Sequence, residues 1–164
     1  MKTLLLIRHA KSGWDNAASS DIERTLTEQG ESDAAVMARR LMEKRIDIDA
    51  FVSSSAKRAR QTTQIFMNEC KHGEKKLLLA PSLYEGSVKD FYCVIDSLND
   101  EDDTVALFAH NPGITDFINS VECSPVYNMP TCAIYGIKIK INHWKEFAAA
   151  EKEFLFFDYP KSAT

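Results

Sequence analysis

The stretch Thr3-Leu4-Leu5-Leu6-Ile7 is a continuous apolar run that stops abruptly at Arg8-His9. Its length suits one β-strand, and the lack of polar alternation is typical of a strand buried on both faces of a mostly parallel sheet. Such a sheet carries helices on both faces, so this run predicts an α/β protein. The polar pair lies where the strand ends and a loop begins.

The chain that follows alternates between short apolar runs and segments with helical periodicity. We expect further strands over 49–53, 77–80 and 104–109. The helices expected between and after them share apolar positions three or four residues apart, or capping residues at their starts. They are a helix with Thr27 as N-cap that buries Ala34, Ala38, Leu41 and Met42, a helix from Arg58 to about Cys70 that Ser53 to Ser55 cap, a helix that buries Phe91, Val94, Ile95 and Leu98, and a helix after Asn111-Pro112-Gly113 with Asn111 as cap and Pro112 at its first position.

The C-terminal part has a different pattern. Residues 132–141 alternate in part between apolar and polar side chains, 148–153 fit a short helical turn, and 154–157 fit one more strand. We expect an antiparallel edge strand here. Residues 1–164 are therefore predicted to form a single α/β domain, a three-layer sandwich with a central, mostly parallel sheet and helices on both faces.

Composition narrows the functional classes. The chain has 164 residues, 45% of them hydrophobic, and a formal net charge of −4, so no global basic field favours nucleic acid or an anionic membrane. The four cysteines lie far apart without a C-x-x-C pair, which argues against a zinc cage or a disulfide framework. Leu4 to Ile7 is too short for a signal sequence or a membrane span, and we expect a cytoplasmic protein.

Three strands are each followed by a polar cluster. Arg8-His9 follows the first strand, Arg58 lies just past the second, and His110 follows the strand over 104–109. In open α/β sheets, ligands bind at the carboxyl ends of the strands. We therefore expect two arginines and two histidines to converge on one spot, where they suit a phosphoryl group.

The chemistry of these side chains supports that interpretation. An arginine presents a planar fork of donors that matches phosphate oxygens, and it stays charged at any working pH. A neutral histidine can attack phosphorus through one ring nitrogen while a carbonyl or carboxylate on the other nitrogen fixes the tautomer. His9 is the candidate nucleophile. His110, at the start of a helix, would donate to the phosphoryl oxygens as charge develops there.

The predicted pocket calls for no metal or other cofactor. Its cationic side chains supply the charge neutralisation that metals provide in other phosphoryl-transfer enzymes, and the sequence has no clustered carboxylates to hold a metal ion.

The three polar clusters lie in the motifs Leu6-Ile7-Arg8-His9-Ala10-Lys11-Ser12, Arg58-Ala59-Arg60-Gln61-Thr62 and His110-Asn111-Pro112-Gly113. These motifs, in their order and spacing, resemble those of the histidine phosphatase superfamily, a phosphoglycerate mutase-like fold. The stretch Arg24-x-Leu26-Thr27-x-x-Gly30 is part of the same resemblance. The branch they resemble most is that of the SixA-like phosphohistidine phosphatases. The first motif departs from the family at Ala10, where Gly is usual. It departs again at Asp15, where many mutase relatives have Asn and which would place a carboxylate near the pocket.

The resemblance implies a role for each matching residue. His9 would be the phosphorylated nucleophile, Arg8 and Arg58 would clamp the phosphate, and His110 would complete the pocket, with Asn111 as a further candidate ligand. Relatives that cleave esters use a carboxylic acid to protonate the leaving alkoxide, and Glu85 after Leu83-Tyr84 is the candidate here.

Three functions remain open at this point. The first is a metal-independent phosphatase that removes phosphate from a phosphohistidine on a signalling or phosphotransfer protein. The second is a phosphatase or mutase of small phosphoesters, which needs a competent acid because an alkoxide leaves poorly, whereas the imidazole of phosphohistidine has a reference pKa of roughly 6.5. The third is a binding module that recognises phosphate without turnover. In each case we expect phosphate or sulfate to fit the pocket.

Overall fold

A six-stranded sheet in the order β3-β2-β4-β1-β5-β6 forms the centre of the protein. It is seen in a computed structural model that describes residues 1–14, 20–70 and 77–162. Four neighbouring strands, β3 to β1 in that order, are parallel, and β5 pairs antiparallel with β1 and with β6. The strands are β1 (Lys2–Arg8), β2 (Ala50–Ser53), β3 (Leu77–Leu79), β4 (Thr104–Ala109), β5 (Ile134–Ile139) and β6 (Lys152–Asp158).

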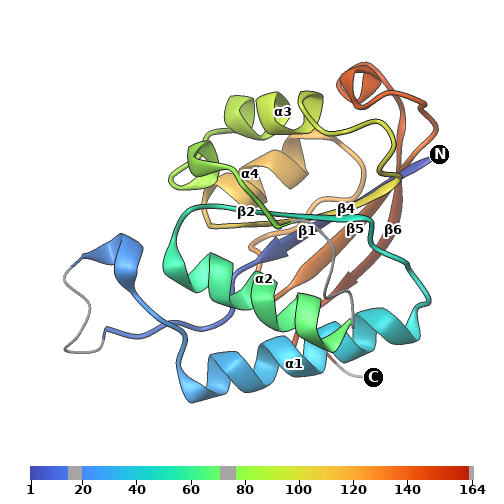
Figure 1. Ribbon diagram of the computed structural model, residues 1–164. Coiled ribbons are helices and arrows are strands. Elements are labelled where there is room, and N and C mark those ends of the chain that lie inside the picture. The colour runs from blue at the N-terminus through green and yellow to red at the C-terminus, as the bar shows by residue number, and fades with distance from the viewer. Residues whose placement is uncertain (15–19, 71–76, 163–164) are drawn as a thin grey trace.

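Helices cover both faces of this sheet, so the expected α/β sandwich is confirmed. Figure 1 shows α1 (Glu28–Glu43) and α2 (Lys57–Glu69) on one face, with α3 (Val88–Asp96) and α4 (Gly113–Ser120) on the other. Three 3-10 turns connect the larger elements: η1 (Asp21–Glu23), η2 (Pro81–Leu83) and η3 (Trp144–Glu146).

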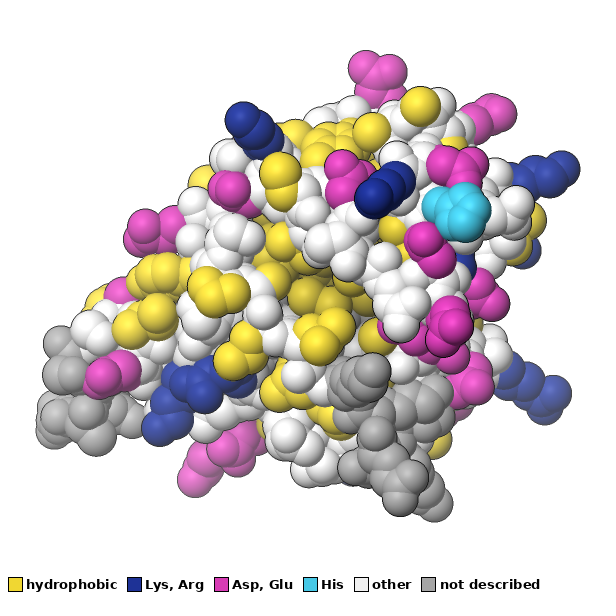
Figure 2. All heavy atoms as spheres, turned by 45° about the horizontal axis from the view of Figure 1, so that its top comes forward, with side chains coloured by type: hydrophobic (Ala, Val, Ile, Leu, Met, Phe, Trp, Pro, Cys, Tyr) yellow, Lys and Arg dark blue, Asp and Glu magenta, His cyan; other side chains and the backbone are white. Residues whose placement is uncertain are grey.

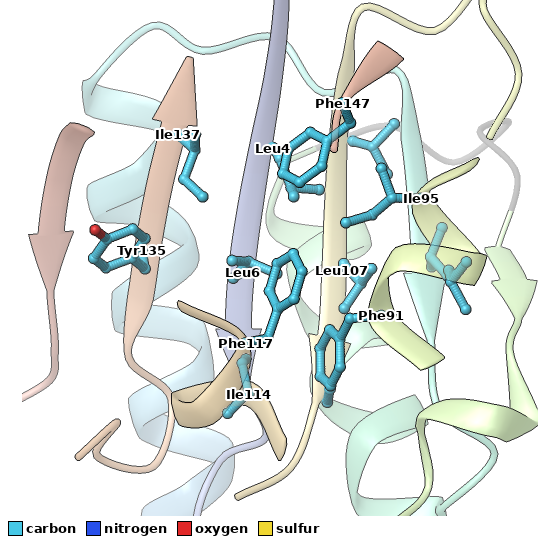
Figure 3. Close-up of a cluster of buried hydrophobic side chains, with 14 of the residues drawn as sticks. Leu4, Leu6, Phe91, Ile95, Leu107, Ile114, Phe117, Tyr135, Ile137 and Phe147 are labelled. Atoms are coloured by element: carbon cyan, nitrogen blue, oxygen red, sulfur yellow. The ribbon is translucent and has the colours of Figure 1, made fainter. Parts of the chain in front are cut away.

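Strand β1 lies between two hydrophobic clusters, as its unbroken apolar run predicts. Leu4 and Leu6 point to the cluster beneath α3 and α4, which Figure 3 shows together with Phe91, Phe117 and Tyr135. Leu5 and Ile7 point the other way, into the cluster beneath α1 and α2. Successive side chains of a strand face opposite sides of the sheet, and here the side chains on both sides are buried. β1 is thus held rigidly, and Arg8 and His9 at its end share that rigidity.

The N-terminus of α1 is the predicted one. The Thr27 side chain accepts a hydrogen bond from the backbone N–H of Gly30 at 3.0 Å, which satisfies one of the free donors of the first turn. The buried face includes Ala34, Ala38 and Leu41 as expected, but Met42 is 40% exposed and Met37 is buried in its place.

Two other local predictions need correction. The helical turn expected over 148–153 ends by about Ala150, because β6 already begins at Lys152 and pairs there with Ile139. The turn starts earlier, at η3, and the Ala150 backbone N–H donates to the Glu146 carbonyl at 3.1 Å. Asn111 does not cap α4, since Pro112 occupies the N-cap position and the Asn111 side chain bonds elsewhere.

The surface mixes charges of both signs. On the face that Figure 2 draws, Lys and Arg side chains are interspersed with Asp and Glu around hydrophobic side chains gathered in the middle. None of the helices within the described residues is long and apolar enough to span a membrane.

Candidate active site

The structure brings Arg8, His9, Arg58 and His110 together at one edge of the sheet. Arg8 is the last residue of β1, His110 follows β4, and Arg58 lies in the first turn of α2 beyond β2. These three strands are neighbours and parallel, so their carboxyl ends meet. The ring centroids of His9 and His110 are 5.0 Å apart. We call these four side chains the floor of the site.

The tautomer of His9 follows from its hydrogen bond. Nδ1 lies 2.7 Å from the carbonyl oxygen of Ala10, which can only accept, so Nδ1 carries the proton. The Ala10 peptide is itself held, because its N–H donates to Thr62 Oγ1 at 3.0 Å. Nε2 therefore carries the free lone pair, as a histidine nucleophile requires.

His110 is oriented by a serine. Its Nε2 lies 2.5 Å from Ser54 Oγ, which also accepts the Ala56 N–H at 3.2 Å. A hydroxyl that already accepts one hydrogen bond can donate its proton to Nε2, which leaves the proton of the ring on Nδ1. The prediction that Ser53 to Ser55 cap α2 is wrong, because Ala56 occupies the N-cap position and no side chain caps that end of the helix.

Both arginines of the floor are held by protein oxygens. Arg8 Nη1 donates to the Met129 carbonyl at 2.9 Å. Arg58 donates from Nη1 to the Asp21 carbonyl at 2.7 Å and from Nη2 to the Asp21 carboxylate at 3.1 Å. The Nε atoms of both guanidiniums are buried and have no hydrogen-bond partner in the part of the chain that the structure describes.

The pKa values of three floor residues are lowered, which shows that the floor disfavours further positive charge and favours a bound anion. Burial, together with the charges of Arg58 and Arg8, lowers the pKa of His9 to about 4. Burial, with His9 and Arg58 nearby, lowers the pKa of His110 to about 3. Burial and the charge of Arg58 also lower the pKa of Arg8. Both histidines are thus neutral near pH 7. The positive charges of Arg8 and Arg58 lie close enough to repel each other, so an oxyanion bound between them would stabilise both.

Unsatisfied donors mark the floor. Among the described residues, the buried side-chain nitrogen and oxygen atoms without a hydrogen-bond partner are Arg8 Nε, Arg58 Nε and His110 Nδ1. Buried polar groups in proteins are normally paired, so three such donors in one cluster call for an acceptor. A tetrahedral oxyanion offers several oxygens to donors that approach from different directions.

Glu85 and Asn111 take up different positions from the floor. Glu85 is exposed, has a φ of 55°, and lines the cavity that opens above Arg58 and His110. Asn111 lines the same cavity, but its amide donates to Asn128 Oδ1 at 2.8 Å and to the Met129 carbonyl at 3.0 Å. The amide therefore holds the loop that binds Arg8, and its use for phosphate stays a prediction.

The structure adds Asp21, a residue that sequence reasoning missed, and places it against Tyr84. Tyr84 Oη donates to Asp21 Oδ2 at 2.7 Å, so that Asp21 lies between Tyr84 and Arg58. We call Asp21, Tyr84 and Glu85 the rim of the site. Asp21 belongs to the short turn η1, and no helical or strand periodicity singles it out. Asp15, the carboxylate expected near the pocket, lies outside the described residues.

Comparisons with known proteins identify the family and the fold of this chain. The family model of the histidine phosphatase superfamily, branch 1, matches residues 4–92. A 2,3-bisphosphoglycerate-dependent phosphoglycerate mutase of Bartonella henselae is 30% identical over 91 residues, which are 54% of this chain and 44% of that protein. The chain thus matches less than half the length of that relative.

Two solved structures share the fold over nearly the whole chain. One, from Agrobacterium tumefaciens and assigned as a phosphohistidine phosphatase SixA, is 22% identical with a TM-score of 0.79 and covers 97% of this chain and 99% of its own. The protein histidine phosphatase SixA complexed with tungstate is also 22% identical, with a TM-score of 0.80, and covers 96% of this chain and 97% of its own. Because the family model matches more than half of this chain, the chain belongs to the histidine phosphatase superfamily.

Proposed function

We propose that this protein is a phosphatase that acts through a phosphohistidine on His9, and that its substrate is a phosphohistidine of another protein. The observation that carries the proposal is the set of unpartnered donors on the floor, Arg8 Nε, Arg58 Nε and His110 Nδ1, beside a histidine whose Nε2 is free to attack. The fold shared with a protein histidine phosphatase that binds tungstate, a tetrahedral oxyanion, supports it further.

In the first step, His9 Nε2 attacks phosphorus in line with the leaving group. A bond from Nε2 to phosphorus forms, the bond to the leaving group breaks, and its electron pair stays with the leaving nitrogen or oxygen. The Ala10 carbonyl accepts from Nδ1–H and stabilises the positive charge that the ring acquires. The donors of Arg8, Arg58 and His110 meet the equatorial oxygens.

In the second step, water attacks the phosphorus of phospho-His9. The P–O bond forms, the P–Nε2 bond breaks, and the electron pair returns to the imidazole, while the water proton goes to solvent or to the group left by the first step. Inorganic phosphate departs, and His9 is neutral again. Its low pKa favours this return, because burial makes the protonated ring unfavourable.

A phosphohistidine substrate suits the position of the carboxylate at the rim. The imidazole that leaves has a reference pKa of roughly 6.5, so it needs little help from an acid. Glu85 is exposed at the mouth of the cavity, so a reaction that does not depend on it fits the site best.

A second candidate function, hydrolysis of small phosphoesters, is favoured by one observation. Glu85 lines the same cavity as Arg58 and His110, where an acid could reach the oxygen of an alkoxide leaving group. An alkoxide requires nearly full protonation as it leaves, so on this hypothesis Glu85 is essential.

The test compares three substrates without added metal and with a chelator. They are a phosphorylated histidine phosphotransfer domain, an aryl phosphate and 3-phosphoglycerate, and phosphate release is measured for each. We expect turnover of the phosphohistidine domain to be lost in His9→Ala. His143→Ala is the matched control, because His143 is exposed and pairs with Asp100, away from the floor.

Each outcome of this test decides between the functions. Turnover of the phosphohistidine domain that depends on His9 supports the proposal. Turnover of small esters alone supports the second candidate. Phosphate binding without any turnover would leave a binding module and overturn the enzyme.

A further inference from the structure

The cavity above the floor has an acidic rim. Its volume is about 390 Å³, and the charged side chains that line it are Asp21, Glu85 and Arg58. Because the cavity is open to Arg58 and His110, it is where the part of a substrate beyond its phosphoryl group would lie. Two carboxylates and one guanidinium face that part of the substrate.

Asp21 is fixed beside Arg58 by three side chains. Its Oδ2 accepts from Tyr84 Oη at 2.7 Å and from Arg58 Nη2 at 3.1 Å, and its Oδ1 accepts from Arg24 Nη1 at 3.1 Å. Arg24 lies in turn over the ring of Trp14, with 4.3 Å from its Cζ to the ring centroid. Asp21 is therefore a preorganised part of the site.

This arrangement divides the donors of Arg58 between two tasks. Nη1 and Nη2 bind Asp21, while Nε is buried without a partner. A phosphoryl oxygen can use Nε while Asp21 keeps its place. The outward charge of Arg58 is then matched by the Asp21 carboxylate, whose pKa the Tyr84, Arg24 and Arg58 hydrogen bonds lower to about 2. Beyond the phosphoryl group, Glu85 also lines the cavity, and the ion pairs seen among the described residues of the rim do not include it.

We propose that Asp21 is a specificity-determining residue that, with the acidic rim, disfavours leaving groups with a negative charge and favours neutral or cationic ones. This inference rests on the proposed function and deepens it. It favours imidazole and amine leaving groups and selects against phosphorylated carboxylic acids such as phosphoglycerate. Asp21 acts here on the leaving group and takes no part in the attack on phosphorus.

The expected size of the effect follows from Coulomb's law. Unit charges a few ångströms apart near a protein surface change an affinity by about ten-fold or more, depending on the local dielectric. Because the rim is half open to solvent, we expect a preference of about ten-fold. Salt screens charges at exposed positions, so the preference should fall as the ionic strength rises.

The test uses two aryl phosphates of similar size whose leaving groups carry opposite charges. O-Phosphotyramine has an ethylammonium group para to the phosphate. 3-(4-Phosphooxyphenyl)propionate has a propionate group at the same position. We expect kcat/KM to favour the ammonium compound by about ten-fold at low salt. In Asp21→Asn the ratio should fall to about three-fold or less, and in the unaltered protein it should shrink in about 0.5 M salt.

The ratio separates charge selection from damage to the floor. If Asp21→Asn merely loosens Arg58, both substrates slow equally and the ratio stays the same, which would overturn the inference. A missing preference in the unaltered protein would overturn it as well. Asp33→Asn is the matched control, because Asp33 lies on α1 and bonds Gln29, and it should leave the ratio unchanged.

Binding of the same two compounds to His9→Ala gives the ratio without turnover. The phosphohistidine phosphotransfer domain is assayed beside these two compounds. If the protein does not turn over that domain but still binds the ammonium compound about ten-fold better, the proposed function fails and the charge preference stands. If it turns over the domain but shows no charge preference between the two compounds, the proposed function stands and the inference fails.

Discussion

The floor and the rim of the site differ in burial and in origin. Three of the four floor residues, His9, Arg58 and His110, are 7%, 6% and 7% exposed, and Arg8 is half-buried. All four lie at or beyond the carboxyl ends of three parallel strands. The rim residues Asp21, Tyr84 and Glu85 are half-buried or exposed and belong to η1 and to the residues after η2. A buried set of donors suits the phosphoryl group that all substrates share, whereas a wet rim suits the leaving group that distinguishes them. Changes to the floor should therefore affect every substrate, and changes to the rim should affect some.

The largest expected effect is on the floor. Arg58→Lys replaces a fork of donors by a point charge and removes the Nε donor, so we expect kcat/KM to fall about a thousand-fold for every phosphorylated substrate. Steady-state kinetics on an aryl phosphate and on a phosphohistidine protein measure it. Arg60→Lys is the matched control, since Arg60 is exposed and bonds only the Ser55 carbonyl among the contacts seen. A loss of kcat/KM for only one of the two substrates would contradict the assignment of Arg58 to a floor that serves every substrate.

The rim should show the opposite behaviour at Glu85. In Glu85→Gln we expect kcat for an alkyl phosphate to fall about a hundred-fold, because the leaving alkoxide loses its proton donor. Dephosphorylation of phosphohistidine should stay within about three-fold, because imidazole leaves without strong acid help. Parallel assays of phosphate release give both values. Equal losses on both substrates would show that Glu85 acts on the phosphoryl group, as the floor does, and not on the leaving group.

The two regions should also respond differently to pH in their contribution to stability. His9 is neutral when folded, with a pKa lowered to about 4, so the unfolded chain takes up its proton first as the pH falls below about 6.5. Stability is thus full above that pH and is lost as the pH drops towards 4. Between pH 8 and pH 5 this loss amounts to about 2 kcal/mol for His9.

Urea unfolding at pH 8 and pH 5 tests this prediction. The loss should be smaller by about 2 kcal/mol in His9→Gln, which has no proton to gain. The Asp21 pKa is lowered from 3.8 to about 2, so its contribution is present above about pH 4 and is lost only below it. Asp21→Asn should therefore leave the difference between pH 8 and pH 5 unchanged. A His9→Gln protein as acid-sensitive as the original would contradict the buried neutral histidine.

The smallest effect is expected one layer beneath the floor. Ser54 is fully buried and orients His110 through Nε2, so Ser54→Ala should lower kcat about ten-fold with little change in KM. Ser54→Thr, which keeps the hydroxyl, should recover most of the loss. Ser55→Ala serves as the control at the neighbouring position. An unchanged kcat would show that His110 needs no support from Ser54.

Much of the fold and of the floor could be predicted from local patterns. The apolar run of β1, the Thr27 cap and the periodicity of α1 and α3 each involve residues close together in the chain. The polar clusters that follow β1, β2 and β4 could be predicted for the same reason. The helical turn expected over 148–153 was placed too late, because pairing of β6 with β5 from Lys152 on, a contact between separate segments, outweighed local propensity.

Other features depend on partners that are distant in sequence. Ser54 meets His110 across 56 positions, and Tyr84 meets Asp21 across 63. No spacing rule links such pairs, because their approach depends on the order of the strands and the path of the loops. The serines consequently suggested a helix cap, and Asp21 attracted no attention.

The amino-acid sequence by itself determined the alternating strands and helices and the residue types at the carboxyl ends of the strands, because hydrophobic periodicity and chain breaks act over a few residues. The tertiary structure alone decided which nitrogen of His9 is free, which donors lack a partner and which carboxylate stands beside Arg58. The His9 tautomer depends on the Ala10 peptide, which Thr62 of another segment holds in place, and the other two depend on side chains from separate segments that meet in a buried space. These contacts exist only once the sheet has formed.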